Sequence, residues 1–166
     1  VSSAASDVYK RQGMMGGTIV MFEGGLSLLS LDAQSGVTCV ESVPSVLSMA
    51  SVIPSIAFVE VTGEALTQGV LDRWPSCVYI YNTYGPTEVS VSATAKLIER
   101  MDLPVGRLES IGRPLPNVTC YVVDTQSDAR SPQLQPIGVW GELWLGGVQV
   151  ARGYLNRPEK TAESFV

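Results

Sequence analysis

The residues best suited to chemistry lie near the middle of the chain, in the run Tyr84-Gly85-Pro86-Thr87-Glu88 with Asn82 just before it. The tyrosine ring can stack on a base, and the glycine lets backbone approach a bound molecule closely. The proline stiffens the turn, the threonine hydroxyl can donate to a phosphate oxygen, and the glutamate is a hard oxygen ligand suited to Mg²⁺. This set predicts a nucleotide site that handles an activated phosphate, although Gly-Pro by itself also marks an ordinary turn.

Four further motifs accompany this run. Thr62-Gly63-Glu64-Ala65-Leu66 precedes it, and Ile111-Gly112-Arg113-Pro114-Leu115-Pro116-Asn117, Gly141-Glu142-Leu143-Trp144-Leu145-Gly146-Gly147 and Ala151-Arg152-Gly153-Tyr154-Leu155 follow it. In this order and spacing, the set resembles adenylate-forming enzymes, specifically the amino-acid adenylation domains of nonribosomal peptide synthetases. The resemblance covers residues 13–166, and the five linked motifs make it specific.

The resemblance implies a role for each residue of the nucleotide site. Tyr84 would stack on the adenine of ATP, while Asn82 and the Thr83 backbone would address the amino edge of the base. Thr87 would hold the α-phosphate, and Glu88 would bind Mg²⁺. The predicted nucleotide-binding residues are Gly63, Glu64, Ala65, Asn82, Thr83, Tyr84, Gly85 and Thr87, the predicted catalytic residues are Thr87 and Glu88, and the predicted metal ligand is Glu88.

The segment Gly63-Glu64-Ala65 matches the glycine-rich strand end that covers the other face of adenine in the family. A side chain at Gly63 would block the ring, and Thr62 replaces the glycine more usual at its position. A structural alternative is that Gly63 and Glu64 begin a helix ending at Trp74, with Glu64 near the positive end of its dipole. Both interpretations can hold at once.

The implied reaction joins the carboxylate of an amino acid to the α-phosphate of ATP and releases pyrophosphate. Its transition state needs stabilisation of negative charge more than it needs a protein nucleophile. The product would pass to the phosphopantetheine thiol of a carrier protein, so carrier-protein and condensation domains of the same synthetase are the implied partners.

Substrate selection can be carried over only by position. The implied amino-acid pocket includes Glu41, Glu60, Thr62, Thr83, Val91 and Ser92. A buried carboxylate at Glu41 would be stabilised by a cationic substrate side chain of the ornithine, lysine or arginine kind. The alternative is that Glu41 and Glu60 are solvated or paired with a local lysine or arginine.

These motifs require elements that bring them together. From Gly17 onward, short β-branched runs alternate with helical patterns, which predicts an α/β fold with βαβ units around a parallel sheet. Strands are expected at Thr18–Phe22, Val37–Val40, Ala57–Val61 and Val78–Tyr81. One helix is expected after Ser42 as its cap, with Pro44 in the first turn and ending before Pro54, and another with Leu66, Val70, Leu71 and Trp74 on one face.

In a parallel sheet, ligands bind beyond the carboxyl ends of the strands. Glu41, Thr62-Gly63-Glu64 and Asn82-Thr83-Tyr84 each follow or end a predicted strand. Three separate segments are therefore expected to converge on one crevice, and this inference does not depend on the family resemblance.

Beyond residue 102 the chain becomes rich in proline, glycine and short strand patterns such as Thr119–Asp124 and Glu142–Leu145. We expect an α/β part at 13–102 and part of a small β-barrel at 103–166. Residues 1–12 are interpreted as a non-native or disordered leader, a native linker being the alternative. Arg152 is expected to be solvated on a glycine-containing hairpin, and Trp74, Trp140 and Trp144 are expected to pack in the core or barrel.

Composition narrows the class of protein. The chain has 166 residues, 45% of them hydrophobic, a net charge of −5 and a pI near 4.7. It carries no cluster of basic residues and no apolar run long enough to span a bilayer, so neither nucleic acid nor membrane is an expected partner. Three widely spaced cysteines favour a cytoplasmic protein without disulfides, and the absence of histidine excludes imidazole chemistry.

Two parts of the implied machinery are expected outside this sequence. A phosphate loop bearing a lysine would precede residue 13, and a ribose-binding aspartate and a small domain with the catalytic lysine would follow Val166. The chain by itself is therefore not expected to catalyse adenylation. The alternatives are an acyl-CoA ligase of the same fold and an inactive truncated module that serves as a nucleotide-binding or structural unit.

Overall fold

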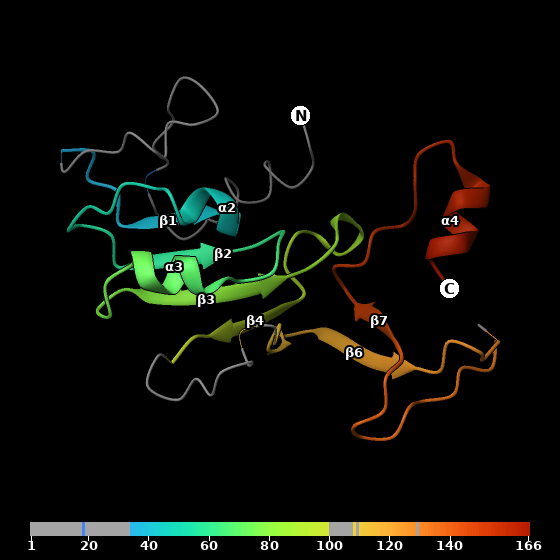
Figure 1. Ribbon diagram of the computed structural model, residues 1–166. Helices are drawn as coiled ribbons and strands as arrows, with labels where there is room; N and C mark the ends of the chain where they lie inside the picture. The colour runs from blue at the N-terminus through green and yellow to red at the C-terminus, as the bar shows by residue number, and fades with distance from the viewer. Residues whose placement is uncertain (1–17, 19–33, 100–107, 109, 129) are drawn as a thin grey trace.

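The computed structural model describes residues 18, 34–99, 108, 110–128 and 130–166. Two expectations fall outside these residues: the leader at 1–12 and, apart from Thr18, the strand at Thr18–Phe22. Within the described part, the chain forms a five-stranded sheet and a separate two-stranded sheet, with a few short helices (Figure 1).

The first sheet is mixed and has the strand order β1-β2-β3-β4-β5. Its strands are β1 (Cys39–Ser42), β2 (Phe58–Val61), β3 (Tyr79–Tyr84), β4 (Thr94–Leu97) and β5 (Arg113–Pro114). The first three pair in parallel, as the alternation of strand and helix patterns predicted, whereas β4 is antiparallel to both β3 and β5. Pairing of β5 with β4 extends this sheet past residue 102.

Two of the three parallel strands, β1 and β3, extend further along the chain than the apolar runs indicated, whereas β2 ends at Val61 as expected. β1 ends at Ser42 rather than at Val40, and β3 ends at Tyr84 rather than at Tyr81. The reason is backbone pairing, because Ser42 pairs with Val61 and Tyr84 pairs with Thr94. The last residues of β1 and β3 are therefore polar, and their side chains still alternate between the two faces of the sheet.

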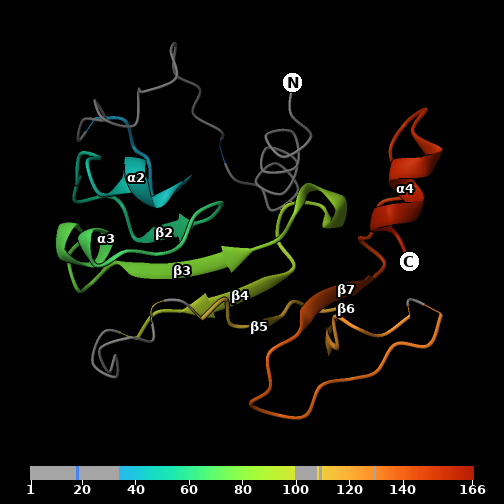
Figure 2. The same cartoon turned by 45° about the vertical axis from the view of Figure 1, so that its right-hand side comes forward.

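Two short helices follow β1 and β2, namely α2 (Pro44–Leu47) and α3 (Gln68–Arg73), and Figure 2 shows both beside the first sheet. Pro44 lies at the start of α2, as predicted, because the missing N–H of proline is unused there. The predicted cap at Ser42 is wrong. Val43 occupies the cap position without a side-chain hydrogen bond, since Ser42 is still part of β1.

The main core lies between these helices and the first sheet. It combines strand residues such as Val59 and Ile80 with Leu66, Val70, Leu71 and Trp74, all of them buried as predicted, although Leu66 precedes α3 and Trp74 is its C-cap rather than part of the helix. Trp74 is 1% exposed, and its indole Nε1 donates a hydrogen bond of 3.1 Å to the Leu47 carbonyl oxygen. This bond links the end of α3 to the end of α2, so the prediction that Trp74 packs in the core is confirmed.

The second sheet pairs β6 (Val118–Val123) with β7 (Glu142–Gly147) in antiparallel fashion, which confirms strands close to the predicted bounds. The helix α4 (Pro158–Ser164) follows, at the opposite end of the molecule from β1 in both Figure 1 and Figure 2. Trp144 in β7 is half-buried, but Trp140 is 93% exposed, so the core role expected for Trp140 is wrong. It lies in the loop before β7, where no strand covers it.

No helix within the described ranges is both long enough and apolar enough to cross a membrane.

The buried indole of Trp74 provides a test of this core. We expect Trp74→Ala to reduce the free energy of unfolding by about 3–5 kcal/mol, because it leaves a cavity and an unpaired Leu47 carbonyl. Trp140→Ala, a matched change at an exposed position, should stay within about 0.5 kcal/mol of the unsubstituted chain. Chemical denaturation followed by circular dichroism measures both, and equal effects would contradict the assignment of Trp74 to the core.

Candidate functional site

Three segments meet at the carboxyl edge of the parallel strands. β1 ends after Glu41, β2 ends immediately before Thr62 and Gly63, and β3 ends at Tyr84. The pairings of Ser42 with Val61 and of Val61 with Asn82 place these ends side by side. The predicted convergence of three strand ends is therefore confirmed.

The two faces of the sheet differ. In register across the strands, Val40, Val59 and Ile80 face the helices and are buried. The alternate residues, including Glu41 paired with Glu60, face the other way. Asn82 and Thr83, being consecutive in β3, consequently point to opposite faces of the sheet.

A hollow of about 330 Å³ opens on the face away from the helices. It is lined by Cys39, Phe58, Val59, Glu60, Tyr81, Thr83, Ser92, Ala95 and Leu115. Of the six predicted substrate-pocket residues, Glu60, Thr83 and Ser92 line this hollow, whereas Glu41, Thr62 and Val91 are not among its lining residues.

Sequence reasoning missed all of the remaining lining residues. Cys39, Phe58 and Tyr81 lie two positions before Glu41, Glu60 and Thr83 in their respective strands, so the two-residue period of a strand could have identified them. Burial, followed by the charges of Glu60 and then Glu41, raises the pKa of the Cys39 thiol. Both carboxylates thus act electrostatically on the same end of the hollow.

Two buried hydroxyl groups line the hollow, and only one of them has a hydrogen-bond partner. The Thr83 hydroxyl is buried and donates to the Val61 carbonyl oxygen at 3.3 Å. Ser92 is 4% exposed, and its Oγ is the one buried side-chain polar atom of the described residues that lacks a hydrogen-bond partner. A buried hydroxyl without a partner is unfavourable by roughly 1–3 kcal/mol, which a bound polar group would relieve.

The Tyr84–Glu88 run forms a tight loop after β3. The loop continues to Ala93, whose backbone N–H donates a 2.7 Å hydrogen bond to the Tyr84 carbonyl oxygen and so joins the two ends of residues 84–93. Gly85 lies so close to the returning chain that a Cβ there would be 2.5 Å from the Val91 carbonyl oxygen. Val91 has a φ of 78°, which is strained for a β-branched residue. The loop is therefore a compact, strained unit in which only glycine fits at position 85.

Glu64 has a structural partner that the sequence did not reveal. Its carboxylate accepts hydrogen bonds from the Ser45 backbone N–H at 3.3 Å and from the Ser45 hydroxyl at 3.2 Å. The idea that Glu64 lies in the first turn of the helix ending at Trp74 is wrong, because α3 begins only at Gln68. Glu64 instead ties the segment after β2 to the first turn of α2.

Asn82 is buried, and its amide nitrogen donates to the Ser110 carbonyl oxygen at 3.1 Å. Bonding of the amide nitrogen leaves the amide oxygen as the group that could accept from a ligand. Tyr84 is 39% exposed and Thr87 is exposed, so the ring and the hydroxyl assigned to the nucleotide are accessible at the surface of the loop.

Glu88 is joined to the chain after β7 by two hydrogen bonds. The Tyr154 hydroxyl donates to Glu88 Oε1, and the Ala151 backbone N–H donates to the Glu88 carbonyl oxygen at 2.7 Å. The Tyr154 hydroxyl and then the backbone N–H of Glu88 itself lower the pKa of the Glu88 carboxyl, and Lys160 adds a smaller effect in the same direction. The carboxylate is consequently ionised at neutral pH.

The segment between β7 and α4 also holds the far side of the loop. The Gln149 side-chain amide donates to the Ser92 carbonyl oxygen at 2.9 Å, and the Ser90 hydroxyl donates to the Gln149 carbonyl oxygen at 3.1 Å. Arg152 is exposed, as expected, but the chain here runs on to α4 rather than forming a hairpin. Sequence reasoning included Tyr154 in a motif but assigned no role in the site to Tyr154 or Gln149.

The geometry can be compared with known proteins. The family described as AMP-binding enzyme matches residues 13–155. Bacitracin synthase 3 of Bacillus licheniformis is 37% identical over 144 residues, which are 86% of this chain and 2% of that protein. Nonribosomal peptide synthetase ataP of Aspergillus terreus is 40% identical over 112 residues, which are 68% of this chain and 7% of that protein.

A solved structure, that of the nonribosomal peptide synthetase FmoA3, aligns with a TM-score of 0.66 and 25% identity. The alignment covers 81% of this chain and 15% of that one. The chain therefore belongs to the family of AMP-binding enzymes, in the branch formed by the adenylation domains of nonribosomal peptide synthetases. It spans between 1% and 9% of the length of the curated relatives it matches.

The close approach at Gly85 generates a prediction. Gly85→Ala should destabilise the loop and distort its outline, because the added Cβ would overlap the Val91 carbonyl oxygen and lie 2.7 Å from the Ala93 nitrogen. Gly69→Ala is the matched control. Gly69 lies in α3, and the nearest atoms to a Cβ there would be 3.7 Å away, which is an ordinary van der Waals distance. In thermal unfolding, the melting temperature should fall clearly for Gly85→Ala and should change little or rise slightly for Gly69→Ala. The reverse order would refute the packing described for the loop.

Proposed function

We propose that this chain forms the central part of an amino-acid adenylation domain, which activates an amino acid with ATP as aminoacyl-AMP. The observation that carries the proposal is the strained loop of residues 84–93, which presents an ionised Glu88 carboxylate after β3, one of three parallel strands whose carboxyl ends lie side by side. The match of the AMP-binding enzyme family to residues 13–155 supports it.

In this proposal, residues of the loop, of β3 and of the segment after β2 each bind a different part of ATP. The exposed ring of Tyr84 stacks on adenine, Gly63 leaves the opposite side of the base open, and Asn82 accepts from its amino group. Thr87 donates its hydroxyl to the α-phosphate, where negative charge develops during transfer. Glu64 and Ala65 help to shape the base site through the segment that Glu64 ties to α2.

Glu88 suits a magnesium ion on its chemistry. A single ionised carboxylate together with substrate phosphates is the usual Mg²⁺ site in enzymes that bind nucleotides. Within the described ranges no group of three acidic or cysteine residues gathers elsewhere as a rival metal site. When bound, the ion would neutralise the phosphate charge that otherwise repels the attacking carboxylate. Glu88 and Thr87 are accordingly the catalytic residues of this chain.

The hollow on the open face of the sheet would receive the amino-acid side chain. Its polar lining, from Glu60, Thr83 and Ser92, includes the unpartnered Ser92 hydroxyl. Thr62 and Val91 border the strand end and the loop rather than the hollow itself. Glu41 adjoins Glu60 in register on the same face, so two negative charges favour a cationic side chain.

Several broader features belong to the same proposal. The β6–β7 sheet is part of a small barrel. The aminoacyl group passes to the phosphopantetheine thiol of a carrier protein. The carrier protein and condensation domains belong to the same synthetase, and the synthetase is cytoplasmic. The relatives' far greater length is consistent with additional domains in one polypeptide.

The role of Glu88 can be tested in the complete synthetase that contains this chain. Glu88→Gln keeps the shape of the side chain and removes its charge, so we expect amino-acid-dependent ATP–pyrophosphate exchange to fall at least about a hundredfold. Glu99→Gln, an exposed carboxylate just after β4, is the matched control and should leave exchange unchanged. Undiminished ATP–pyrophosphate exchange by Glu88→Gln would contradict the catalytic, metal-binding role of Glu88.

The pocket charge makes a separate prediction. Glu60→Gln should lower kcat/KM for lysine or ornithine by about tenfold or more, because a charged hydrogen bond is lost, and should leave kcat/KM for norleucine unchanged. Glu41→Ala should act in the same direction. Exchange assays with these amino acids measure both, and equal effects on charged and neutral substrates would contradict a pairing role for the carboxylates.

A further inference from the structure

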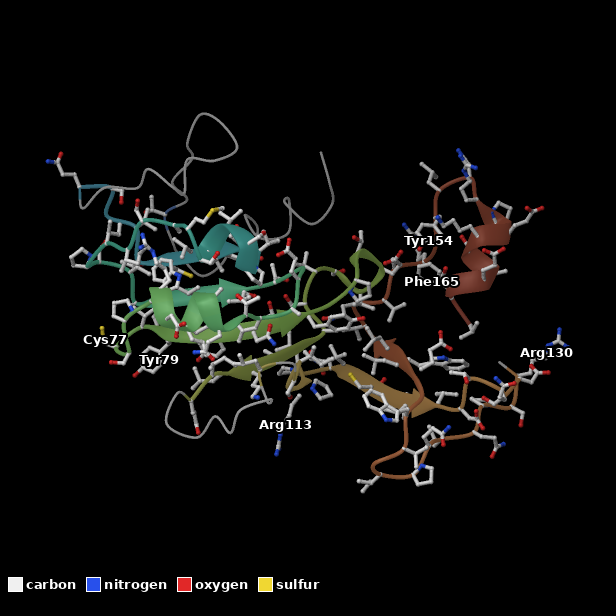
Figure 3. The ribbon with its side chains drawn as sticks, viewed as in Figure 1. Cys77, Tyr79, Arg113, Arg130, Tyr154 and Phe165 are labelled. Atoms are coloured by element: carbon white, nitrogen blue, oxygen red, sulfur yellow. The ribbon has the colours of Figure 1, made fainter. Side chains whose placement is uncertain are left out.

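Tyr154 is held by α4 with its hydroxyl directed at the site. Its backbone N–H donates to Thr161 Oγ1 at 2.9 Å, and its ring meets Phe165 edge-on with centroids 5.5 Å apart. Lys160 Nζ lies 5.3 Å from the centroid of the same ring. Figure 3 shows Tyr154 and Phe165 together beside α4. Contacts on the ring and on the backbone together restrict where the hydroxyl can point.

The residue before Tyr154 is adapted to this contact. Gly153 has a φ of +135°, and a Cβ there would lie 2.4 Å from Thr161 Cγ2. Glycine therefore allows the chain to pass close to α4 and turn the tyrosine toward Glu88. The bond from Ala151 to the Glu88 backbone fixes the same segment from its other side.

A tyrosine hydroxyl is a suitable partner for a carboxylate that must also bind a metal ion. It donates one hydrogen bond to Oε1 and leaves Oε2 with its lone pairs unused by this contact. Unlike lysine or arginine, it is neutral and does not cancel the negative charge that a cation requires. Partners of this kind orient metal ligands, and their removal typically weakens metal binding about 10- to 100-fold.

We propose that Tyr154 is a positioning residue that holds the Glu88 carboxylate in the orientation in which its second oxygen binds the magnesium ion of ATP. This inference rests on the proposed function, because it assumes that Glu88 is the ligand. It assigns to the segment between β7 and α4 a part in the chemistry, through Glu88, rather than only in the packing of the second sheet.

The test is the affinity of the complete synthetase for α,β-methylene ATP, measured by titration calorimetry with Mg²⁺ and with EDTA. The gain in affinity that Mg²⁺ produces reports the metal contact without any turnover. Tyr154→Phe keeps the ring against Phe165 and removes the hydroxyl, so we expect this gain to fall about tenfold or more. The metal-free affinity and the melting temperature should stay close to those of the unsubstituted enzyme.

Two further variants define the outcomes. Tyr121→Phe removes a hydroxyl from an exposed ring on β6 and should keep the full Mg²⁺ gain. Glu88→Gln should abolish the gain. If Glu88→Gln abolishes it and Tyr154→Phe does not reduce it, the positioning role is overturned while the proposed function stands. If Glu88→Gln also retains the gain, the metal site of the proposed function fails first.

A variant at Thr161 keeps the test decisive if Tyr154→Phe does not fold. Thr161→Val has nearly the same shape but removes the oxygen that accepts the Tyr154 N–H. A folded Thr161→Val enzyme with a reduced Mg²⁺ gain would support the positioning of Tyr154 by α4. An undiminished gain in that enzyme would overturn it.

Discussion

Parallel pairing of β1, β2 and β3 forces the chain to cross back over the sheet after β1 and again after β2, and the two crossovers place α2 and α3 against the same core. The apolar face is covered in this way, while the three carboxyl ends are brought to one edge. The opposite face carries Glu41, Glu60 and the hollow. Both the loop after β3 and the hollow on the open face follow from this one arrangement of strands.

The loop that follows β3 begins at this edge of the sheet and has a compact, closed conformation. Closure between Tyr84 and Ala93 presses the backbone of residues 91–93 against Gly85, and the strained φ of Val91 shows that the turn is imposed by its surroundings. Support comes from the second sheet, where Val118 packs with Val89 and Ala93. The first sheet positions the loop, and residues 145–154 keep it in shape.

Strands β1, β2, β3, β6 and β7, the buried face of α3 and the meeting of three strand ends could be predicted from local apolar patterns, whereas the antiparallel β4 and β5 were not among the expected strands. The cap at Ser42 could not, since pairing with Val61 extends β1 beyond its apolar run. Neither could the hydrogen bonds from Ser45 to Glu64 or from Tyr154 to Glu88, which join residues 19 and 66 positions apart. The exposure of Trp140 was missed because its loop lacks any periodic pattern that reports burial. The roles assigned to individual site residues remain predictions of motif and geometry.

The separation of 66 residues between Glu88 and Tyr154 has a consequence for biosynthesis. At ribosomal rates of about 5–20 residues per second, roughly 3 to 13 s pass between synthesis of the two side chains. When that interval begins, β1, β2 and β3 have all been synthesised, whereas the tyrosine that donates to the Glu88 carboxylate has not. The contact between Glu88 and Tyr154 can therefore form only after the residues of the whole first sheet have been synthesised.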